Sequence, residues 1–199
     1  MPMLISICIP VYNGEKFLRK CLDSIANQSM KDFEIIVVDD CSSGCNENEW
    51  NCKKICKVFT KETKVKVNYL RNSKNLGSLE ARRTAVYEAK GDYIFCVDCD
   101  DVLEPDCLER LANTAIASKA EIIHCGAKVV PAIKDVEEKA NLLFEGELKE
   151  KTVFDYTINS HNVSFYLWGK LIKRDVFISA LEIIPPCYCV FGEDYLVYF

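Results

Sequence analysis

This sequence lacks several features that define common classes of protein. It has no basic stripe, because 25 lysines and arginines stand against 30 aspartates and glutamates and the formal net charge is -5. Grooves that bind nucleic acid carry clustered positive charge, so we expect no nucleic-acid partner. The sequence also has neither a P-loop nor the glycine triplet of a dinucleotide-binding fold. Its two histidines, His124 and His161, have no partners that suggest a catalytic triad, and we expect both to be structural.

Long apolar runs are absent as well. No stretch reaches the roughly 18 residues that a membrane-spanning helix needs. Leu4 to Val11 is a short apolar run without a basic flank, which does not fit a signal peptide. We therefore expect a cytoplasmic location. Any association with the inner face of the cell membrane would be peripheral, through segments outside this chain.

Cysteine, in contrast, is abundant, with 12 residues. In a chain without a signal peptide these are expected to be reduced thiols. Cys41, Cys45, Cys52 and Cys56 are separated by three, six and three residues. This spacing does not fit the paired knuckles of a structural zinc site, so thiols on a loop and a helix are the favoured interpretation.

The apolar pattern predicts an α/β fold of one domain. Short apolar runs alternate with amphipathic segments, which is typical of a mostly parallel central sheet with helices on both faces. Strands are expected over 5–11, 33–38, 65–70, 93–97 and 121–125. Helices are expected over 15–26, 47–60, 78–90, 105–116, near 153–158 and from 193 onward.

Polar side chains follow four of the expected strands, at the edge of the sheet where α/β proteins bind ligands. They are Asn13, Asp39, Asp40, Asn72, Asp98, Asp100 and Asp101. Clustered carboxylates repel one another unless they share a cation, so a divalent metal that also binds a diphosphate is indicated. Taken alone, Asp39-Asp40 fits a turn and helix cap equally well. Three carboxylates in the four residues 98–101 cannot all be caps.

Five separated segments carry a specific resemblance. They are residues 6–13, 33–42, 75–82, 89–101, and 168–171 followed by Glu193-Asp194. In order and spacing they resemble the family 2 glycosyltransferases, which have the GT-A fold. The resemblance implies a nucleotide-sugar-binding half over 1–126 and an acceptor-side half over 127–199. It also implies that the chain stops short of a complete family member.

On matching positions, the resemblance implies a nucleotide pocket. Its first wall is the turn after the first strand, with Pro10, Tyr12 and Asn13. Asp39 would accept a hydrogen bond from the base. An ionised carboxylate only accepts, so it favours the imide N–H of uracil over the bare ring nitrogen of cytosine.

The resemblance also assigns the metal and the donor sugar. Asp98 and Asp100 form the D-x-D element, with Asp100 expected to bind Mn²⁺ or Mg²⁺ and Asp98 the ribose or a metal-bound water. Asp101 is expected to begin a helix or to support these residues. Arg82 would lie close to the nucleotide-sugar, with a solvated helix face as the alternative. Arg83 departs from the family pattern, which commonly has asparagine there.

For catalysis, the resemblance implies that Asp194 takes the proton of the acceptor hydroxyl as its oxygen attacks the anomeric carbon. Trp168 and Gly169 would shape the acceptor side, unless Trp168 is a core residue. The expected function is inverting transfer from a nucleotide-diphosphate sugar, expected to be a UDP-sugar, to a saccharide or lipid-linked saccharide. Family members commonly build cell-surface polysaccharide or lipopolysaccharide.

Three other hypotheses stay open from the sequence. Residues 93–102 resemble the nucleophile strand of haloacid-dehalogenase-like phosphatases, although there the motif normally opens the domain. Residues 37–40 resemble the acidic pocket of a response-regulator receiver, although receivers carry it on their first strand. A non-catalytic fragment that binds nucleotide is the third.

Overall fold

The computed structural model describes residues 4–44, 51–131, 134, 137–138, 141 and 166–189. Its centre is one six-stranded sheet, and four neighbouring strands of it are parallel. The remaining two strands extend the sheet by antiparallel pairing. In sheet order the strands are β3 (Val67–Arg71), β2 (Phe33–Asp39), β1 (Ile5–Val11), β4 (Tyr93–Cys96), β6 (Lys170–Lys173) and β5 (Ile122–His124).

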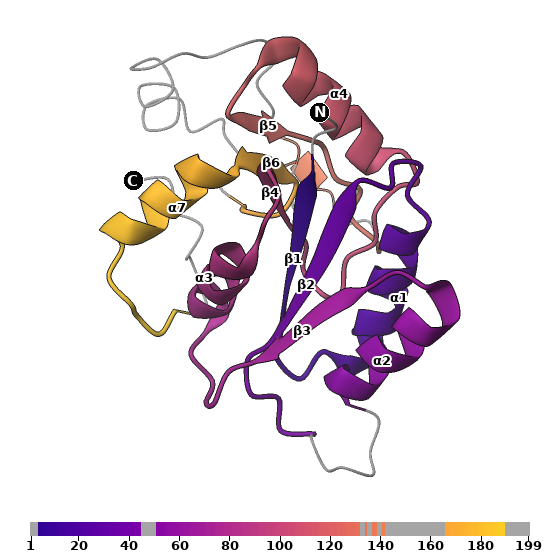
Figure 1. Cartoon of the computed structure of the whole chain (residues 1–199), viewed down its shortest axis with the longest axis vertical. Coiled ribbons are helices and arrows are strands. Elements are labelled where there is room, and N and C mark those ends of the chain that lie inside the picture. The colour runs from indigo at the N-terminus through magenta and orange to yellow at the C-terminus, as the bar shows by residue number, and fades with distance from the viewer. Residues whose placement is uncertain are drawn as a thin grey trace.

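Helices cover both faces of this sheet (Figure 1). One face carries α1 (Glu15–Ala26), α2 (Cys52–Thr63) and α4 (Cys107–Ser118), and the other carries α3 (Ser78–Glu88) and α7 (Arg174–Ile183). Within the described ranges, no helix is both long and apolar enough to cross a bilayer. The expected α/β architecture with a mostly parallel sheet is therefore confirmed.

Side-chain alternation along the central strands explains why both faces are covered. In β1, Ile7 and Ile9 pack under α1, whereas Cys8 packs under α3. Successive side chains of a strand point to opposite faces of the sheet, so a strand that is apolar throughout must be covered on both faces. Two separate apolar clusters result, one on each side of the sheet.

Several predicted boundaries shift by a few residues. The helix expected over 47–60 is described from Cys52 to Thr63, because Asn51 caps it and Lys64 ends it in a left-handed conformation. Residues 47–50 lie outside the described part. The helix expected over 78–90 ends at Glu88, where the backbone becomes extended.

Two elements were not predicted from the sequence, namely β6 and α7. Strand β6 is short and begins and ends with lysine, so the aromatic and apolar run over 164–172 gives no separate signal for it. The helices expected near 153–158 and from 193 lie outside the described residues. The division at residue 126 stays a prediction.

Helix α1 gives a test of the core. On this helix, Phe17 is 42% exposed, whereas Leu22 is 0% exposed. Leu22→Ala should lower the free energy of unfolding by about 2–5 kcal/mol, because it leaves a cavity. Phe17→Ala, the matched control on the same helix, should cost less than about 1 kcal/mol. Denaturant titration measures both, and equal losses would contradict this packing.

Candidate functional site

A cleft of about 280 Å³ lies at the carboxyl ends of the parallel strands. Its walls come from the ends of β1 and β2, the loop before α3, α3 itself and the loop after β4. The residues lining it are Pro10, Val11, Tyr12, Asp40, Asn75, Ser78, Ala81, Arg82, Asp98, Cys99 and Asp100. Four chain segments that are distant in sequence therefore meet at the edge where α/β sheets bind ligands.

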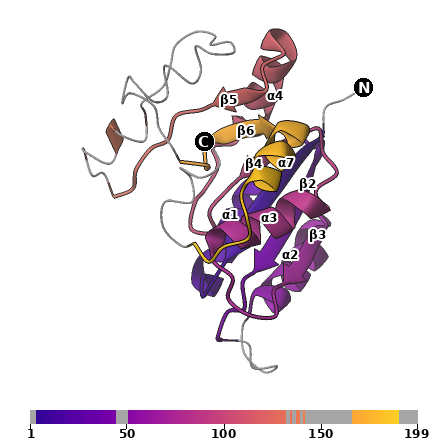
Figure 2. The ribbon, with the colours of Figure 1, turned by 90° about the vertical axis from the view of Figure 1, so that its left-hand side faces the viewer.

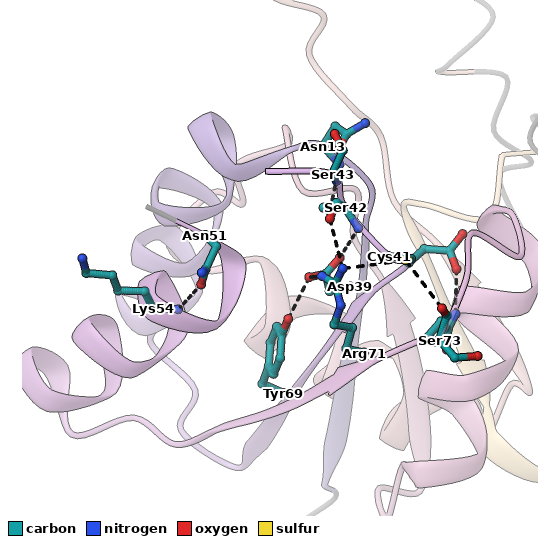
Figure 3. A network of polar contacts seen from close by, with 12 residues as sticks. Asn13, Asp39, Cys41, Ser42, Ser43, Asn51, Lys54, Tyr69, Arg71 and Ser73 are labelled. Carbon is teal, nitrogen blue, oxygen red and sulfur yellow. Dashed lines mark hydrogen bonds and ion pairs between the residues drawn. The ribbon is translucent and has the colours of Figure 1, made fainter. Parts of the chain in front are cut away.

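Asp39, the last residue of β2, is fully buried beside this cleft. Its Oδ1 accepts from the backbone N–H of Ser42 at 2.8 Å. Its Oδ2 accepts from the hydroxyl of Tyr69 at 2.7 Å and from the guanidinium of Arg71 at 2.6 Å (Figure 3). Tyr69 and Arg71 lie two residues apart on β3, so both side chains point to the same face of the sheet.

These contacts set the charge on Asp39. Burial by itself would raise its pKa, but the N–H of Ser42, the hydroxyl of Tyr69 and the charge of Arg71 together hold the pKa below its usual value. Burial and the bond to Asp39 raise the pKa of Tyr69. At neutral pH the pair is therefore a carboxylate and a neutral phenol.

Asn13 connects the turn after β1 to the loop after β2. Its backbone N–H donates to Oγ of Ser42 at 2.9 Å, and its Oδ1 accepts from the N–H of Ser43 at 2.8 Å. Its φ of 52° lies in the left-handed region, which asparagine tolerates better than most residues. Asn13 thus shapes the rim, whereas Pro10 and Tyr12 line the cleft itself.

Asp40 organises the loop that leads into α3. It is 3% exposed, and its carboxylate accepts from Asn72 Nδ2 at 2.7 Å and from the backbone N–H of Gly77 at 2.8 Å. The N–H of Leu76 donates to both carboxylate oxygens, at 3.0 and 3.1 Å. A buried carboxylate with this many donors fixes the loop, and with it the start of α3.

Arg82 is buried on α3, with 5% of its side chain exposed, and it donates to Oδ1 of Asp98 at 2.7 Å. The alternative of a solvated helix face is therefore wrong for Arg82. Asp98 remains 34% exposed in the cleft. This ion pair joins α3 to the loop after β4 and sets a positive charge beside the carboxylates.

The loop after β4 is held against α1. A Cβ on Gly14, just before α1, would lie 2.5 Å from Sγ of Cys99, so a larger residue there would displace the Cys99 side chain. Cys21 of α1 donates its S–H to the carbonyl of Asp98 at 3.7 Å. With Cys99 turned toward α1, Asp98 and Asp100 line the cleft on either side of it.

Asp98, Asp100 and Asp101 stand together in this loop, and carboxylate oxygens are ligands that hard cations prefer. Desolvation by the surrounding protein and then the negative charges of Asp98 and Asp100 raise the pKa of Asp101 to about 6. Among the described residues, no group of three or more His, Cys, Asp or Glu side chains is arranged to hold a metal. A cation bound by Asp98 or Asp100 would therefore take further ligands from water and a diphosphate, as Mg²⁺ and Mn²⁺ do.

Trp168 lies beside Cys96 at the end of β4, through an isolated bridge. Its ring stacks on Tyr166, with centroids 4.7 Å apart and planes 16° from parallel. Both rings are half-buried.

The predicted base, Asp194, lies outside the described residues, as does His161. Burial and then the charge of Lys170 lower the pKa of His124 to about 4, so this histidine is neutral.

Three of the four cysteines singled out by their spacing are described. Cys41 lies on a loop, whereas Cys52 and Cys56 are buried in α2. Cys45 is not among the described residues.

Most of the predicted site residues thus converge. Pro10, Tyr12, Arg82, Asp98 and Asp100 all line the cleft. Asn13 and Asp39 stand behind it and support its walls. Sequence reasoning placed Asp40 at this edge but missed the lining role of Asn75, Ser78 and Cys99. All three lie inside the segments that carry the family resemblance, which was the available signal.

Comparison with known proteins agrees with this geometry. Residues 6–179 match the model of the glycosyl transferase family 2. Glycosyltransferase GlyA of Streptococcus pneumoniae serotype 4 is 38% identical over 186 residues, which are 87% of this chain and 25% of that protein. S. aureus TarS 1-349 in complex with UDP covers 98% of this chain at 21% identity, with a TM-score of 0.69 and 54% of its own chain matched.

A further solved structure is the mannosyltransferase PcManGT from Pyrobaculum calidifontis in complex with GDP-Man and Mn²⁺. It has a TM-score of 0.60 and 18% identity, and the match covers 89% of this chain and 46% of that one. The fold is thus that of the GT-A glycosyltransferases. This chain belongs to the glycosyl transferase family 2.

The chain spans only part of these proteins, from a quarter of GlyA to about half of TarS 1-349. The family match gives no support to the phosphatase or the receiver hypothesis.

The buried network of Asp39 yields a pH prediction. Its native pKa lies below the unfolded value of about 4, so the stabilisation is complete above that pH and is lost as the pH falls through the native pKa. Asp39→Asn should cost about 1.5–3 kcal/mol at pH 7. The cost should shrink in acid. Unfolding titrations from pH 7 to 3 measure it, and a difference that does not vary with pH would contradict the assignment.

Proposed function

We propose that this protein is an inverting glycosyltransferase that moves a sugar from a UDP-sugar to a hydroxyl of a saccharide or lipid-linked saccharide. The observation that carries the proposal is the cleft in which buried Arg82 pairs with Asp98 while Asp100 faces solvent. Family membership supports sugar transfer, and the neighbours solved with UDP and with GDP-Man support a nucleotide-sugar.

The donor's nucleoside would lie against Pro10 and Tyr12, with its base directed toward Asp39. Asp39 has no exposed surface, whereas Arg71 covers it with a side chain that is 33% exposed. Arg71 must therefore move aside, or the loop at Ser42 must shift, before a base contacts this carboxylate. Because Asp39 is ionised and can only accept, the base in contact must present an N–H, as uracil does.

The diphosphate would lie between Arg82 and Asp100. Asp100 would hold Mn²⁺ or Mg²⁺, and Asp98, already paired with Arg82, would contact the ribose or a bound water. When bound, such a cation supplies positive charge for the diphosphate of the leaving nucleotide. Arg82 adds a second positive charge that is fixed in place before the donor binds.

For the transfer itself, we assign the base to Asp194. Inversion requires the acceptor oxygen to attack the anomeric carbon from the side opposite the leaving UDP. A carboxylate within hydrogen-bond reach of that hydroxyl accepts its proton as the new bond forms. We also assign the stacked pair Tyr166 and Trp168 to the acceptor side, because an aromatic face suits a sugar ring.

This function fits a role in cell-surface polysaccharide or lipopolysaccharide synthesis. Donors of this kind are made in the cytoplasm, and the acceptor would be presented at the inner face of the cell membrane. Contact with the membrane would be peripheral and would come from residues outside this chain.

Calorimetry with UDP tests the donor site. We expect UDP to bind with Mn²⁺ present and to bind at least about tenfold more weakly with EDTA, a loss of ~1.4 kcal/mol. Asp100→Asn should lose most of the Mn²⁺-dependent gain, because it removes a charged ligand. Asp32→Asn, an exposed carboxylate before β2, is the control and should behave as wild type. Equal affinity with Mn²⁺ and with EDTA would overturn the metal assignment.

The base assignment has its own test. Asp194→Asn should keep wild-type affinity for UDP with Mn²⁺ while transfer falls about 100-fold or more, because the proton of the acceptor loses its destination. Glu193→Gln provides the neighbouring control. Full transfer activity in Asp194→Asn would remove this residue as the base, and wild-type protein that binds UDP without any turnover would favour the non-catalytic fragment.

A further inference from the structure

Helix α3 presents a second polar pair on the side away from Arg82. Glu80 and Arg83 form an ion pair at 3.1 Å, and only 13% and 11% of their side chains are exposed. Figure 2 shows α3 and α7 side by side. A nearly buried ion pair costs desolvation, so its remaining donors and acceptors are expected to have partners.

Those partners are at the end of α7 and on the segment that follows it. Arg83 donates to the carbonyl of Leu181 through Nη1 and to that of Ile184 through Nη2, the latter at 2.9 Å. Oε1 of Glu80 accepts from the N–H of Cys187 at 3.3 Å. The pair thus forms hydrogen bonds with backbone carbonyl and N–H groups and, within the described residues, with no side chain of that segment. We call Glu80 and Arg83 together the bracket.

The same segment then reaches the entrance to α3. Cys189 forms an isolated bridge with Gly77, and its carbonyl accepts from Oγ of Ser78 at 3.1 Å. Figure 1 shows the yellow segment after α7 returning toward the start of α3. Gly77 has a φ of 90°, and a Cβ there would lie 2.5 Å from the carbonyl oxygen of Cys189, so only glycine permits this approach.

This contact lies at the donor cleft. The N–H of Gly77 donates to Asp40, and Ser78 lines the cleft. The two residues at the start of α3 that contact Cys189 are therefore also part of the cleft wall. Only four residues separate Cys189 from Asp194. A chain extends at most about 3.6 Å per residue, so Asp194 lies within roughly 18 Å of Cys189 along the chain.

We propose that Glu80 and Arg83 are positioning residues, which clamp residues 184–189 against the start of α3 so that the chain beyond Cys189 begins beside the donor cleft. This inference rests on the proposed function for its catalytic consequence. It also gives Arg83 a role at a position where the family commonly has asparagine.

The test compares Arg83→Met and Glu80→Gln with Arg110→Met, an exposed arginine of α4 whose side chain is 78% exposed. In both bracket variants, amide hydrogen exchange over 184–189 should rise about tenfold or more, while affinity for UDP with Mn²⁺ stays within about threefold. The kcat for UDP release from UDP-glucose or UDP-N-acetylglucosamine should fall about 10- to 100-fold, with the donor KM nearly unchanged. Arg83→Lys, which keeps the charge but not the two-carbonyl fork, should be intermediate.

Unchanged exchange over 184–189 in both variants would overturn the bracket. So would wild-type kcat in a variant whose exchange has risen. If Arg83→Met does not fold, Glu80→Gln carries the test, because it keeps the shape of the side chain. Wild-type protein that neither binds UDP nor releases it would refute the proposed function, and the exchange measurement would still decide the bracket.

Discussion

The cleft depends on how two adjacent carboxylates are satisfied at the buried end of β2. Asp39 and Asp40 point to opposite sides of the strand, and each is almost completely removed from water. A buried carboxylate without donors is costly, so each one fixes the structure around it. Asp39 fixes the turn at Ser42 together with β3, and Asp40 fixes the loop that begins α3.

The position of α3 then determines the rest of the site. Its start at Gly77 is held by Asp40, and one turn later Arg82 reaches Asp98 across the cleft. A different side of the same helix holds the segment after α7 through Arg83. One helix thus carries a positive charge toward the cleft and a backbone clamp toward the segment after α7.

Much of this arrangement follows from the sequence, and the limits have physical causes. The boundaries of β1 and α1 could be predicted because an apolar run ends in a turn cluster and an amphipathic period begins directly after it. The doubled carboxylates predicted the edge of the cleft, because they come directly after apolar strands whose carboxyl ends meet at one edge of the sheet. The antiparallel strand β6 could not be predicted, because its pairing with β4 joins residues far apart in the chain, such as Ile94 and Ile172, which are 78 positions apart.

Charge partners were equally invisible. Periodicity places Arg82 on the apolar side of α3, but a buried arginine is plausible only with a carboxylate beside it, and Asp98 comes 16 residues later. Asp39 shows the opposite effect: the motif marks it as a binding residue, yet in the fold its oxygens are occupied by Ser42, Tyr69 and Arg71. Its contact with a base would therefore require a local rearrangement.

The central claim is that this edge of the sheet binds the diphosphate of a UDP-sugar between Arg82 and Asp100. A crystal structure with UDP and Mn²⁺, with the manganese located by its anomalous signal, tests it most directly. We predict a manganese peak within about 2.0–2.4 Å of a carboxylate oxygen of Asp100, next to the diphosphate, with the uracil on the Tyr12 and Asp39 side. Manganese bound away from residues 98–101, or UDP bound outside this cleft, would contradict the account.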